Sequence, residues 1–214
     1  MQRNAYEPTV YNVTTQTGPD ETDPADIDWA ERQTRAAIRF RVIDTPKGPR
    51  PLNPITDPAE LPDGRGGLWH WGEAVAADAI VYARPVDGPH HVLLVKRGDG
   101  NGWALPGGML DPDETPRTAA ARELEEETGL VVDAAAFTSL AARGVPDPRA
   151  GRHAWMVTFP AVAVLHPGPL PEVKGLDDAA DAAWFPATWT AVHEATGGHL
   201  FAAHVDLLRD VLAP

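Results

Sequence analysis

The stretch GGMLDPDETPRTAAARELEEETGL (residues 107–130) places the strongest limits on the fold of this chain. Two glycines and a run of loop-forming residues lead into a segment that carries helix signals at both ends. Thr115 is a suitable N-cap, Pro116 fits the first turn, and Gly129 fits the C-terminal stop. The stretch therefore predicts a loop followed by a helix that begins at Pro116 and ends at about Thr128.

The predicted helix carries four glutamates near its end, and their spacing matters. Positions three and four apart share one face of a helix, so Glu123, Glu126 and Glu127 point the same way. Glu125 turns aside. Three carboxylates on one face repel each other and have raised pKa values unless a cation neutralises them. A divalent ion such as Mg²⁺, which prefers oxygen ligands, suits this face; the alternative is a solvated acidic helix end, which charge runs often form.

Two neighbouring features favour the metal site over a solvated helix end. Arg122 lies just before the glutamates, where it can hold a carboxylate by a bidentate hydrogen bond. Gly107 and Gly108 precede the helix by a short loop and lack a side chain, so their backbone carbonyls can approach a metal closely. We therefore expect Mg²⁺ at this site, with Mn²⁺ as the alternative.

Composition limits the partners of the chain. Its formal net charge of −13 argues against broad contact with nucleic acid, which requires lysine and arginine. An acidic protein can still handle phosphate esters when divalent cations lie between its carboxylates and the phosphates. Cysteine is absent, which excludes disulfides and thiol-ligated metals but leaves the compartment open. No apolar run is long enough to span a bilayer and no signal peptide is visible, so we expect a cytoplasmic protein without membrane contact.

The rest of the chain reads as strands with helices inserted between them. Up to about Gly67 it is polar and rich in proline, with one alternating strand over residues 38–44 and a long irregular segment after it. Further extended segments are expected at residues 77–84, 91–97, 103–106, 153–165 and 182–187. An amphipathic helix is expected over residues 200–213. This order predicts a mixed sheet sandwiched by helices, the α/β class.

The acidic helix also resembles a known family. Every fixed position of the Nudix box is filled, by Gly108, Glu114, Arg122, Glu123, Leu124, Glu126, Glu127, Gly129 and Leu130. Many fixed positions at fixed spacing make a strong signal. The resemblance implies the Nudix α/β/α sandwich with a mixed sheet, and hydrolysis of a nucleoside diphosphate linked to another group.

The resemblance also implies roles for the box residues. Glu123, Glu126 and Glu127 would bind Mg²⁺, with help from the carbonyl of Gly107 or Gly108. Glu114 and Arg122 would hold the geometry of the loop and helix. The catalytic set is thus Glu114, Arg122, Glu123 and Glu127, and metal ions would neutralise the diphosphate and lower the pKa of an attacking water. The base that takes the proton of this water stays open among Glu123, Glu127, Glu172, Asp177, Asp178 and Asp181.

The segments around the box resemble the ADP-ribose pyrophosphatase family of mitochondria and the related hydrolase-like domain of a melastatin-type channel. They are RPLNP, GRGGLWHWG, DAIVYAR, WALPGGMLDPDE, GVPDPR, HAWMVT, GLDDAADAAWFP and LFAAH, in this order. The resemblance implies an N-terminal accessory region, residues 1–66, that contributes to the substrate cleft of a Nudix domain at residues 67–214. AGRH at residues 150–153 departs from the family pattern, which has an asparagine and an acidic residue there.

Recognition of ADP-ribose requires a flat apolar surface for adenine and polar groups for the riboses and the diphosphate. The candidate stacking residues are Trp69, Trp71, Trp103 and Trp155. The candidate polar contacts are Arg65, Asp147, Arg149, Asp177 and Asp178. Each has a purely structural alternative, as a packing tryptophan, a surface ion pair or a turn-forming aspartate.

Three functions remain open at this point. The first is Mg²⁺-dependent hydrolysis of ADP-ribose to AMP and ribose 5-phosphate. The second is hydrolysis of another small nucleotide, such as a nucleotide sugar, a dinucleoside polyphosphate or an oxidised nucleoside triphosphate. The third is an ADP-ribose sensor without turnover, which the complete set of metal carboxylates disfavours. The sequence does not indicate an oligomeric state.

Overall fold

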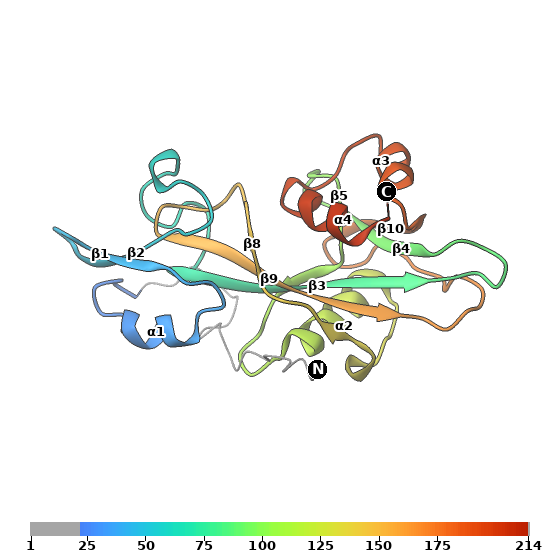
Figure 1. Cartoon of the computed structure of the whole chain (residues 1–214), viewed down its shortest axis with the longest axis horizontal. Helices are drawn as coiled ribbons and strands as arrows, with labels where there is room; N and C mark the ends of the chain where they lie inside the picture. The colour runs from blue at the N-terminus through green and yellow to red at the C-terminus, as the bar shows by residue number, and fades with distance from the viewer. Residues whose placement is uncertain (1–21, 214) are drawn as a thin grey trace. The chain divides into compact units, whose positions relative to one another are not determined.

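The computed structural model describes residues 22–213, which divide into two compact units (Figure 1). Unit 1 contains residues 22–76, 109–116 and 141–159, and unit 2 contains residues 77–108, 117–140 and 160–213. Unit 1 thus joins the described part of the expected accessory region to two later segments of the chain. Residues 1–21, the beginning of that region, lie outside the described residues, as does the expectation that they hold no signal peptide.

Unit 1 contains a two-stranded hairpin of β1 (Arg41–Thr45) and β2 (Gly48–Leu52), which pair antiparallel. The expected strand at residues 38–44 is confirmed, although it begins later. The expectation that only irregular chain follows it is wrong, because β2 lies there. Gly48, with φ of +93°, adopts the left-handed backbone that closes the turn opposite Thr45.

The core of unit 1 is aromatic. Helix α1 (Trp29–Arg35) begins where the Asp28 side chain accepts a hydrogen bond from the Glu31 N–H, and it buries Trp29. The ring of Phe40 lies 6.3 Å from that of Trp29 and 5.0 Å from that of Trp155. A short 3₁₀ helix, η1 (Pro58–Glu60), follows the hairpin.

The central sheet has eight strands, with the order β10-β4-β3-β9-β7 and three short strands paired along it. Its strands are β3 (Gly72–Ala83), β4 (His91–Arg97), β5 (Trp103–Ala104), β6 (Gly107–Met109), β7 (Thr138–Ser139), β8 (Arg143–Val145), β9 (Ala154–Val164) and β10 (Ala179–Pro186). The neighbours β10 and β4, β4 and β3, and β7 and β9 pair antiparallel. The arrows of β3 and β9 point the same way, so the sheet is mixed, as expected (Figure 1).

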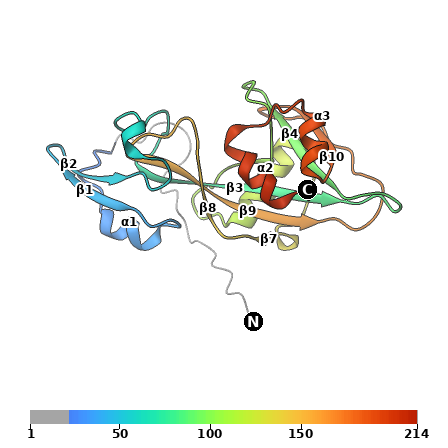
Figure 2. The ribbon, with the colours of Figure 1, turned by 45° about the horizontal axis from the view of Figure 1, so that its top comes forward.

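The helices of unit 2 complete the α/β/α sandwich. Helix α2 (Pro116–Thr128) lies on one face of the strands, and α3 (Trp189–Ala195) and α4 (Val205–Val211) lie on the other (Figures 1 and 2). Two 3₁₀ turns, η2 (Ala134–Ala136) and η3 (Ala202–His204), accompany them. None of the helices in the described part of the chain has the length and apolar character that a membrane span requires.

Most expected elements of unit 2 are confirmed. β4 and α2 have the expected bounds, and Gly129 ends α2 in the left-handed conformation, with φ of +71°. The expected C-terminal helix is shorter, because η3 precedes α4. Helix α3 was not expected; it begins where the Thr188 hydroxyl accepts a hydrogen bond from the Ala191 N–H.

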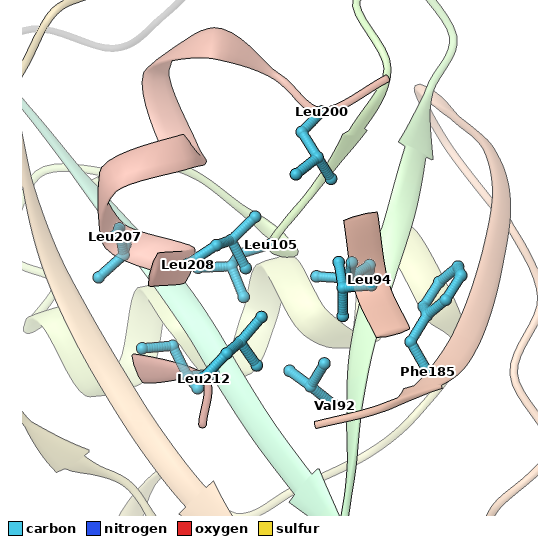
Figure 3. Packing of buried hydrophobic residues seen from close by; sticks show 10 residues of the cluster. Val92, Leu94, Leu105, Phe185, Leu200, Leu207, Leu208 and Leu212 are labelled. Carbon is cyan, nitrogen blue, oxygen red and sulfur yellow. The ribbon is translucent and has the colours of Figure 1, made fainter. Parts of the chain in front are cut away.

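The apolar residues of α4 pack against the sheet of unit 2 (Figure 3). The buried cluster contains Ile80, Val92, Leu94, Leu105, Phe185, Val192, Leu200, Leu207, Leu208 and Leu212. Figure 3 shows Leu208 directed toward Leu105, which belongs to the loop before the glycines. The C-terminal segment therefore stabilises the chain next to the acidic helix.

Leu208→Ala should lower the free energy of unfolding by about 2–5 kcal/mol, because it opens a cavity at a fully buried position. Chemical denaturation followed by circular dichroism measures this change. Val131→Ala, at a position that is 71% exposed, is the control and should change stability by less than about 0.5 kcal/mol. Equal effects of the two substitutions would contradict the packing described here.

Candidate active site

Helix α2 places its glutamates in different surroundings. Leu124 is fully buried and anchors the helix in unit 2. Glu127, three positions later, is also buried, and the Glu123 side chain is only 15% exposed. Glu125 and Glu126 are exposed. The helix therefore has two sheltered carboxylates, with a third at the edge of the same face.

Arg122 links two of these carboxylates. Its Nη1 donates to Glu123 Oε1 at 2.8 Å and to Glu126 Oε2 at 2.9 Å. One guanidinium nitrogen thus joins two carboxylate side chains. Charge-assisted hydrogen bonds of this kind are strong enough to fix side-chain orientation. Arg122 accordingly holds two candidate metal ligands and offsets part of their charge.

Glu127 is the most perturbed carboxylate of the site. Its Oε2 accepts a hydrogen bond from the Gly107 N–H at 2.9 Å. The pKa of Glu127 is raised to about 9, mainly by burial and in smaller part by the neighbouring carboxylates of Asp178 and Glu123. The Gly107 hydrogen bond opposes this rise without cancelling it. Glu127 in the metal-free protein therefore keeps a proton at neutral pH, and a cation can replace that proton.

The glutamates of this structure are turned onto protein partners. In residues 22–213, no group of three or more histidine or acidic side chains surrounds a common point as a metal cage. Glu123 and Glu126 accept from Arg122, and Glu127 accepts from Gly107. The chemistry of the donor set nevertheless fits a divalent cation, because Glu123, Glu126 and Glu127 offer carboxylate oxygens on α2, next to the glycine backbone of β6.

Gly107 and Gly108 lie so close to neighbouring atoms that neither position has room for a side chain. A Cβ at Gly107 would lie 2.5 Å from the Ala77 carbonyl oxygen and 2.5 Å from Asp78 Oδ1. A Cβ at Gly108 would collide with the Glu123 carboxylate. These glycines therefore let strand β6 enter the narrow space between β3 and α2, which brings its backbone to the candidate metal ligands.

A buried pair that sequence reasoning missed supports the same loop. His204 Nδ1 accepts a hydrogen bond from the Leu105 N–H at 3.1 Å, and His204 Nε2 lies 3.5 Å from Asp78 Oδ1. Both side chains are buried. The Ala79 N–H donates to the Pro106 carbonyl at 2.7 Å, so the loop is fixed from two sides. The sequence offered one signal for this pair, since Asp78 is the acidic residue within the otherwise apolar run AVAADAIVYA at residues 74–83.

The loop after residue 170 brings one of its aspartates to the acidic helix. The Leu176 N–H donates to the Glu127 carbonyl at 2.9 Å, which fixes the loop against the end of α2. Asp178 is close enough to raise the pKa of Glu127. Asp177 has a φ of +50°, a backbone conformation typical of turn aspartates. Of the two candidate contacts, the structure thus places Asp178 beside the site and Asp177 in a turn.

Three of the candidate stacking tryptophans, Trp69, Trp103 and Trp155, differ in exposure. Trp155 is fully buried in unit 1 against Phe40, so its ring cannot receive adenine and its assignment as a substrate contact is corrected here. Trp103 is partly buried, and its ring packs edge-on against Phe185 at 4.9 Å. Trp69 is 44% exposed in unit 1. Trp69 therefore offers the most accessible ring of the three.

The polar candidates of unit 1 form a small network. Arg149 Nε and Nη2 donate to the two carboxylate oxygens of Asp147 at 2.9 and 2.7 Å, and Asp147 is buried. The Gly67 N–H donates to the Arg149 carbonyl at 2.7 Å, which brings the segment of Arg65 to this pair. Asp147 thus serves as the support of Arg149, whose side chain is 55% exposed.

Glu114, the second expected brace, also belongs to unit 1. Its Oε2 accepts a hydrogen bond from the Asp111 N–H at 2.8 Å, and the Glu114 N–H donates to the Asp111 carbonyl at 3.1 Å. Asp113 between them adopts a left-handed conformation, with φ of +69°. Glu114 therefore closes the turn that leads into α2.

The fold and the acidic helix agree with the comparison to known families. The model of the NUDIX domain family matches residues 72–205, which is more than half of the 214 residues. The chain belongs to the Nudix family. The match begins at the first residue of β3 and includes the whole acidic helix.

Curated relatives of this Nudix chain differ in their named substrates. The mitochondrial ADP-ribose pyrophosphatase of Rattus norvegicus is 36% identical over 91 residues, 36% of this chain and 25% of the relative. The ADP-ribose pyrophosphatase of Methanocaldococcus jannaschii is 32% identical over 115 residues, 52% of this chain and 61% of the relative. A hydrolase of a CMP phosphonate derivative from Streptomyces rubellomurinus is 42% identical over 74 residues, 33% and 34% of the two chains. The chain spans less than two thirds of the length of each.

Among solved structures, a bifunctional NMN adenylyltransferase/ADP ribose pyrophosphatase from Francisella tularensis is similar to this Nudix chain. The TM-score is 0.51 at 30% identity, over 65% of this chain and 40% of that one. A second structure under the same name contains AMP and a Mn ion, with a TM-score of 0.50 and 27% identity over 65% and 41% of the two chains. The similarity supports the fold and indicates that a protein of this fold binds a divalent metal.

The raised pKa of Glu127 predicts how stability depends on pH. The folded metal-free protein keeps a proton that the unfolded chain releases above about pH 4.5, so its stability should fall as pH rises from about 5 to 9. Thermal unfolding in EDTA measures this fall. A divalent cation that replaces this proton should stabilise the folded protein more strongly as pH rises over the same range. Glu127→Gln should flatten both trends, and an unchanged pH profile in this variant would contradict the assignment.

Gly107→Ala should lower both stability and hydrolytic activity, because its Cβ meets backbone and Asp78 atoms at 2.5 Å. Thermal unfolding and chromatography of the nucleotide products measure the two effects. Gly168→Ala is the matched control, since its nearest neighbour lies 3.9 Å away. Normal stability and activity in Gly107→Ala would show that the close packing of β6 is not needed.

Proposed function

We propose that the chain is a Mg²⁺-dependent diphosphatase that hydrolyses ADP-ribose to AMP and ribose 5-phosphate. The observation that carries the reaction class is the carboxylate face of α2 in a Nudix chain, with the buried Glu127 held at the Gly107 N–H. Glu127 would exchange its proton for the cation, since burial and the neighbouring carboxylates raise its pKa to about 9.

The residues of the site would divide the work as follows. Glu123, Glu126 and Glu127 would hold Mg²⁺ or Mn²⁺, with the backbone carbonyls of Gly107 and Gly108 beside them. The bound ion would supply charge neutralisation of the diphosphate and a more acidic water. Arg122 fixes two of the ligands through its Nη1. Asp178, a base candidate of the later loop, lies close enough to Glu127 to raise its pKa.

ADP-ribose is proposed from the segments around the box and from the names of relatives. The rat, archaeal and Francisella proteins are named ADP-ribose pyrophosphatases. In unit 1, the buried Asp147 fixes the orientation of the Arg149 guanidinium through two hydrogen bonds. The remaining N–H groups of Arg149 could then contact a phosphate or ribose hydroxyls. Trp69 offers an exposed ring for a base.

A second candidate is hydrolysis of another nucleotide derivative by the same carboxylates. The Streptomyces rubellomurinus relative, which is named for a CMP derivative, favours it. The two candidates share the metal ligands and differ in the groups that bind the rest of the substrate. Substrate preference, not the presence of activity, therefore separates them.

Purified protein with Mg²⁺ should release AMP and ribose 5-phosphate from ADP-ribose with a higher kcat/KM than it shows for other nucleotide sugars, dinucleoside polyphosphates or oxidised triphosphates. Chromatography of the products measures this. Glu127→Gln should lower the rate about 100-fold or more, because a metal ligand is lost. Glu125→Gln, exposed on the same helix, is the matched control and should keep the rate.

A preference for another nucleotide would overturn the ADP-ribose assignment and leave the reaction class intact. Tight ADP-ribose binding without turnover of any compound would instead indicate a sensor. Equal rates in Glu127→Gln and Glu125→Gln would overturn the role of the acidic face.

A further inference from the structure

Gly107 lies beside two buried carboxylates of unit 2. Its N–H donates to Glu127 Oε2 at 2.9 Å, and the side on which a Cβ would stand faces Asp78, whose Oδ1 would lie 2.5 Å from that Cβ. Asp78 belongs to β3 and Glu127 belongs to α2, so one glycine of β6 joins the sheet to the acidic helix. The division of work proposed above gives a role to Glu127 and none to Asp78, although only 3% of Asp78 is exposed.

The ring of His204 connects Asp78 to the loop that precedes Gly107. His204 Nδ1 accepts from the Leu105 N–H at 3.1 Å, and Nε2 lies 3.5 Å from Asp78 Oδ1. Because a backbone N–H only donates, Nδ1 carries no proton, and the proton of the neutral ring lies on Nε2, toward Asp78. The buried ring therefore bridges Leu105 and Asp78 and uses both of its nitrogens.

Neighbouring contacts hold this ring in place. The ring of Phe201 packs against it with 5.1 Å between the ring centres, and the His204 N–H donates to the Phe201 carbonyl at 2.9 Å. The Trp103 N–H donates to the His199 carbonyl at 2.9 Å, and the Phe201 N–H donates to the Trp103 carbonyl at 2.8 Å. The segment that carries His204 is thus tied to β5, so the ring has little freedom to leave Asp78.

Leu105 and Pro106 complete the link to the glycine. The Leu105 side chain lies in the buried cluster that Figure 3 shows. The Pro106 carbonyl accepts from the Ala79 N–H at 2.7 Å, one residue after Asp78 in β3. A hydrogen bond weakens when its donor moves away from the acceptor or out of line with it. The position of this loop therefore decides how well the Gly107 N–H holds the carboxylate of α2.

We propose that Asp78 and His204 are positioning residues that set how tightly the acidic face of α2 binds a divalent cation. The inference rests on the metal site of the proposed function and deepens it. The pair acts through Gly107, whose N–H orients the Glu127 carboxylate. Groups that orient a metal ligand in this way typically change metal affinity about 10- to 100-fold when they are removed. Substitution of the pair leaves every carboxylate of α2 in the chain, so it tests orientation alone.

Binding of Mn²⁺ to the whole protein without substrate tests the proposal, with the free ion measured by electron paramagnetic resonance. Asp78→Ala and His204→Ala should each weaken binding about tenfold or more, because the glycine loop is no longer held. Asp78→Asn keeps the shape of the side chain and an acceptor toward His204 Nε2, so its affinity should stay within about threefold of the unsubstituted protein. Val192→Ala is the stability control, because it opens a cavity at a fully buried position of α3 and should bind Mn²⁺ normally.

The Mg²⁺ dependence of ADP-ribose hydrolysis gives a second readout. In His204→Ala, the Mg²⁺ concentration that gives the half-maximal rate should rise about tenfold. The KM for ADP-ribose at saturating Mg²⁺ should change less than about twofold, since the substrate contacts stay in place. A purely structural role would lower the amount of folded protein and would leave both values unchanged.

Several results would overturn the proposal. One is equal Mn²⁺ affinity in Asp78→Ala, His204→Ala and the unsubstituted protein. Another is a loss of affinity in Val192→Ala as large as theirs, which would reflect stability alone. A third is a loss in Asp78→Asn equal to that in Asp78→Ala, because the charge of Asp78 and not its position would then act on the cation. Thermal unfolding shows which variants fold, and His204→Ala and Asp78→Asn decide the test if Asp78→Ala does not.

The inference and the proposed function can fail separately. Mn²⁺ binding that depends on the pair, in a protein that does not hydrolyse ADP-ribose, would support the inference while the proposed substrate fails. Hydrolysis of ADP-ribose with the same Mg²⁺ dependence in His204→Ala would support the function and overturn the inference. Absence of Mn²⁺ binding in the unsubstituted protein would overturn the inference together with the metal site.

Discussion

The hydrogen bond from the Gly107 N–H to the buried carboxylate of Glu127 is the contact on which the candidate active site depends. It joins the glycine strand β6 to the acidic helix α2, and it requires that no side chain occupy the space between them. Burial of this carboxylate is unfavourable for its charged form, which is why its pKa rises to about 9. The same unfavourable burial makes the position receptive to a cation.

Other parts of unit 2 act through this contact. The His204 ring accepts from the Leu105 N–H and lies beside Asp78, so the C-terminal segment holds the loop that ends at Gly107. The apolar residues of α4 pack on the same loop (Figure 3). Arg122 then fixes Glu123 and Glu126 relative to one another. Stability of the C-terminal half and geometry of the carboxylates are therefore coupled.

Unit 1 contains several well-oriented positive side chains. The chain as a whole is acidic, with 18 lysines and arginines against 31 aspartates and glutamates. Arg149 is held by Asp147, and Arg50 and Arg65 are held by the ring of Trp71. In both cases a buried or half-buried neighbour orients the guanidinium. Such orientation lowers the entropy lost when an anion binds.

The sequence by itself determined the Nudix family, the bounds of α2 and the common face of its glutamates, because helical spacing and box spacing are local properties. Only the tertiary structure decided that Trp155 is a core residue and that Asp78 and His204 support the glycine loop. It also decided that Arg50 is buried, and that β2 lies within a stretch that reads as irregular. These features arise from residues far apart in the chain, and burial depends on what packs against a side chain rather than on its sequence neighbours.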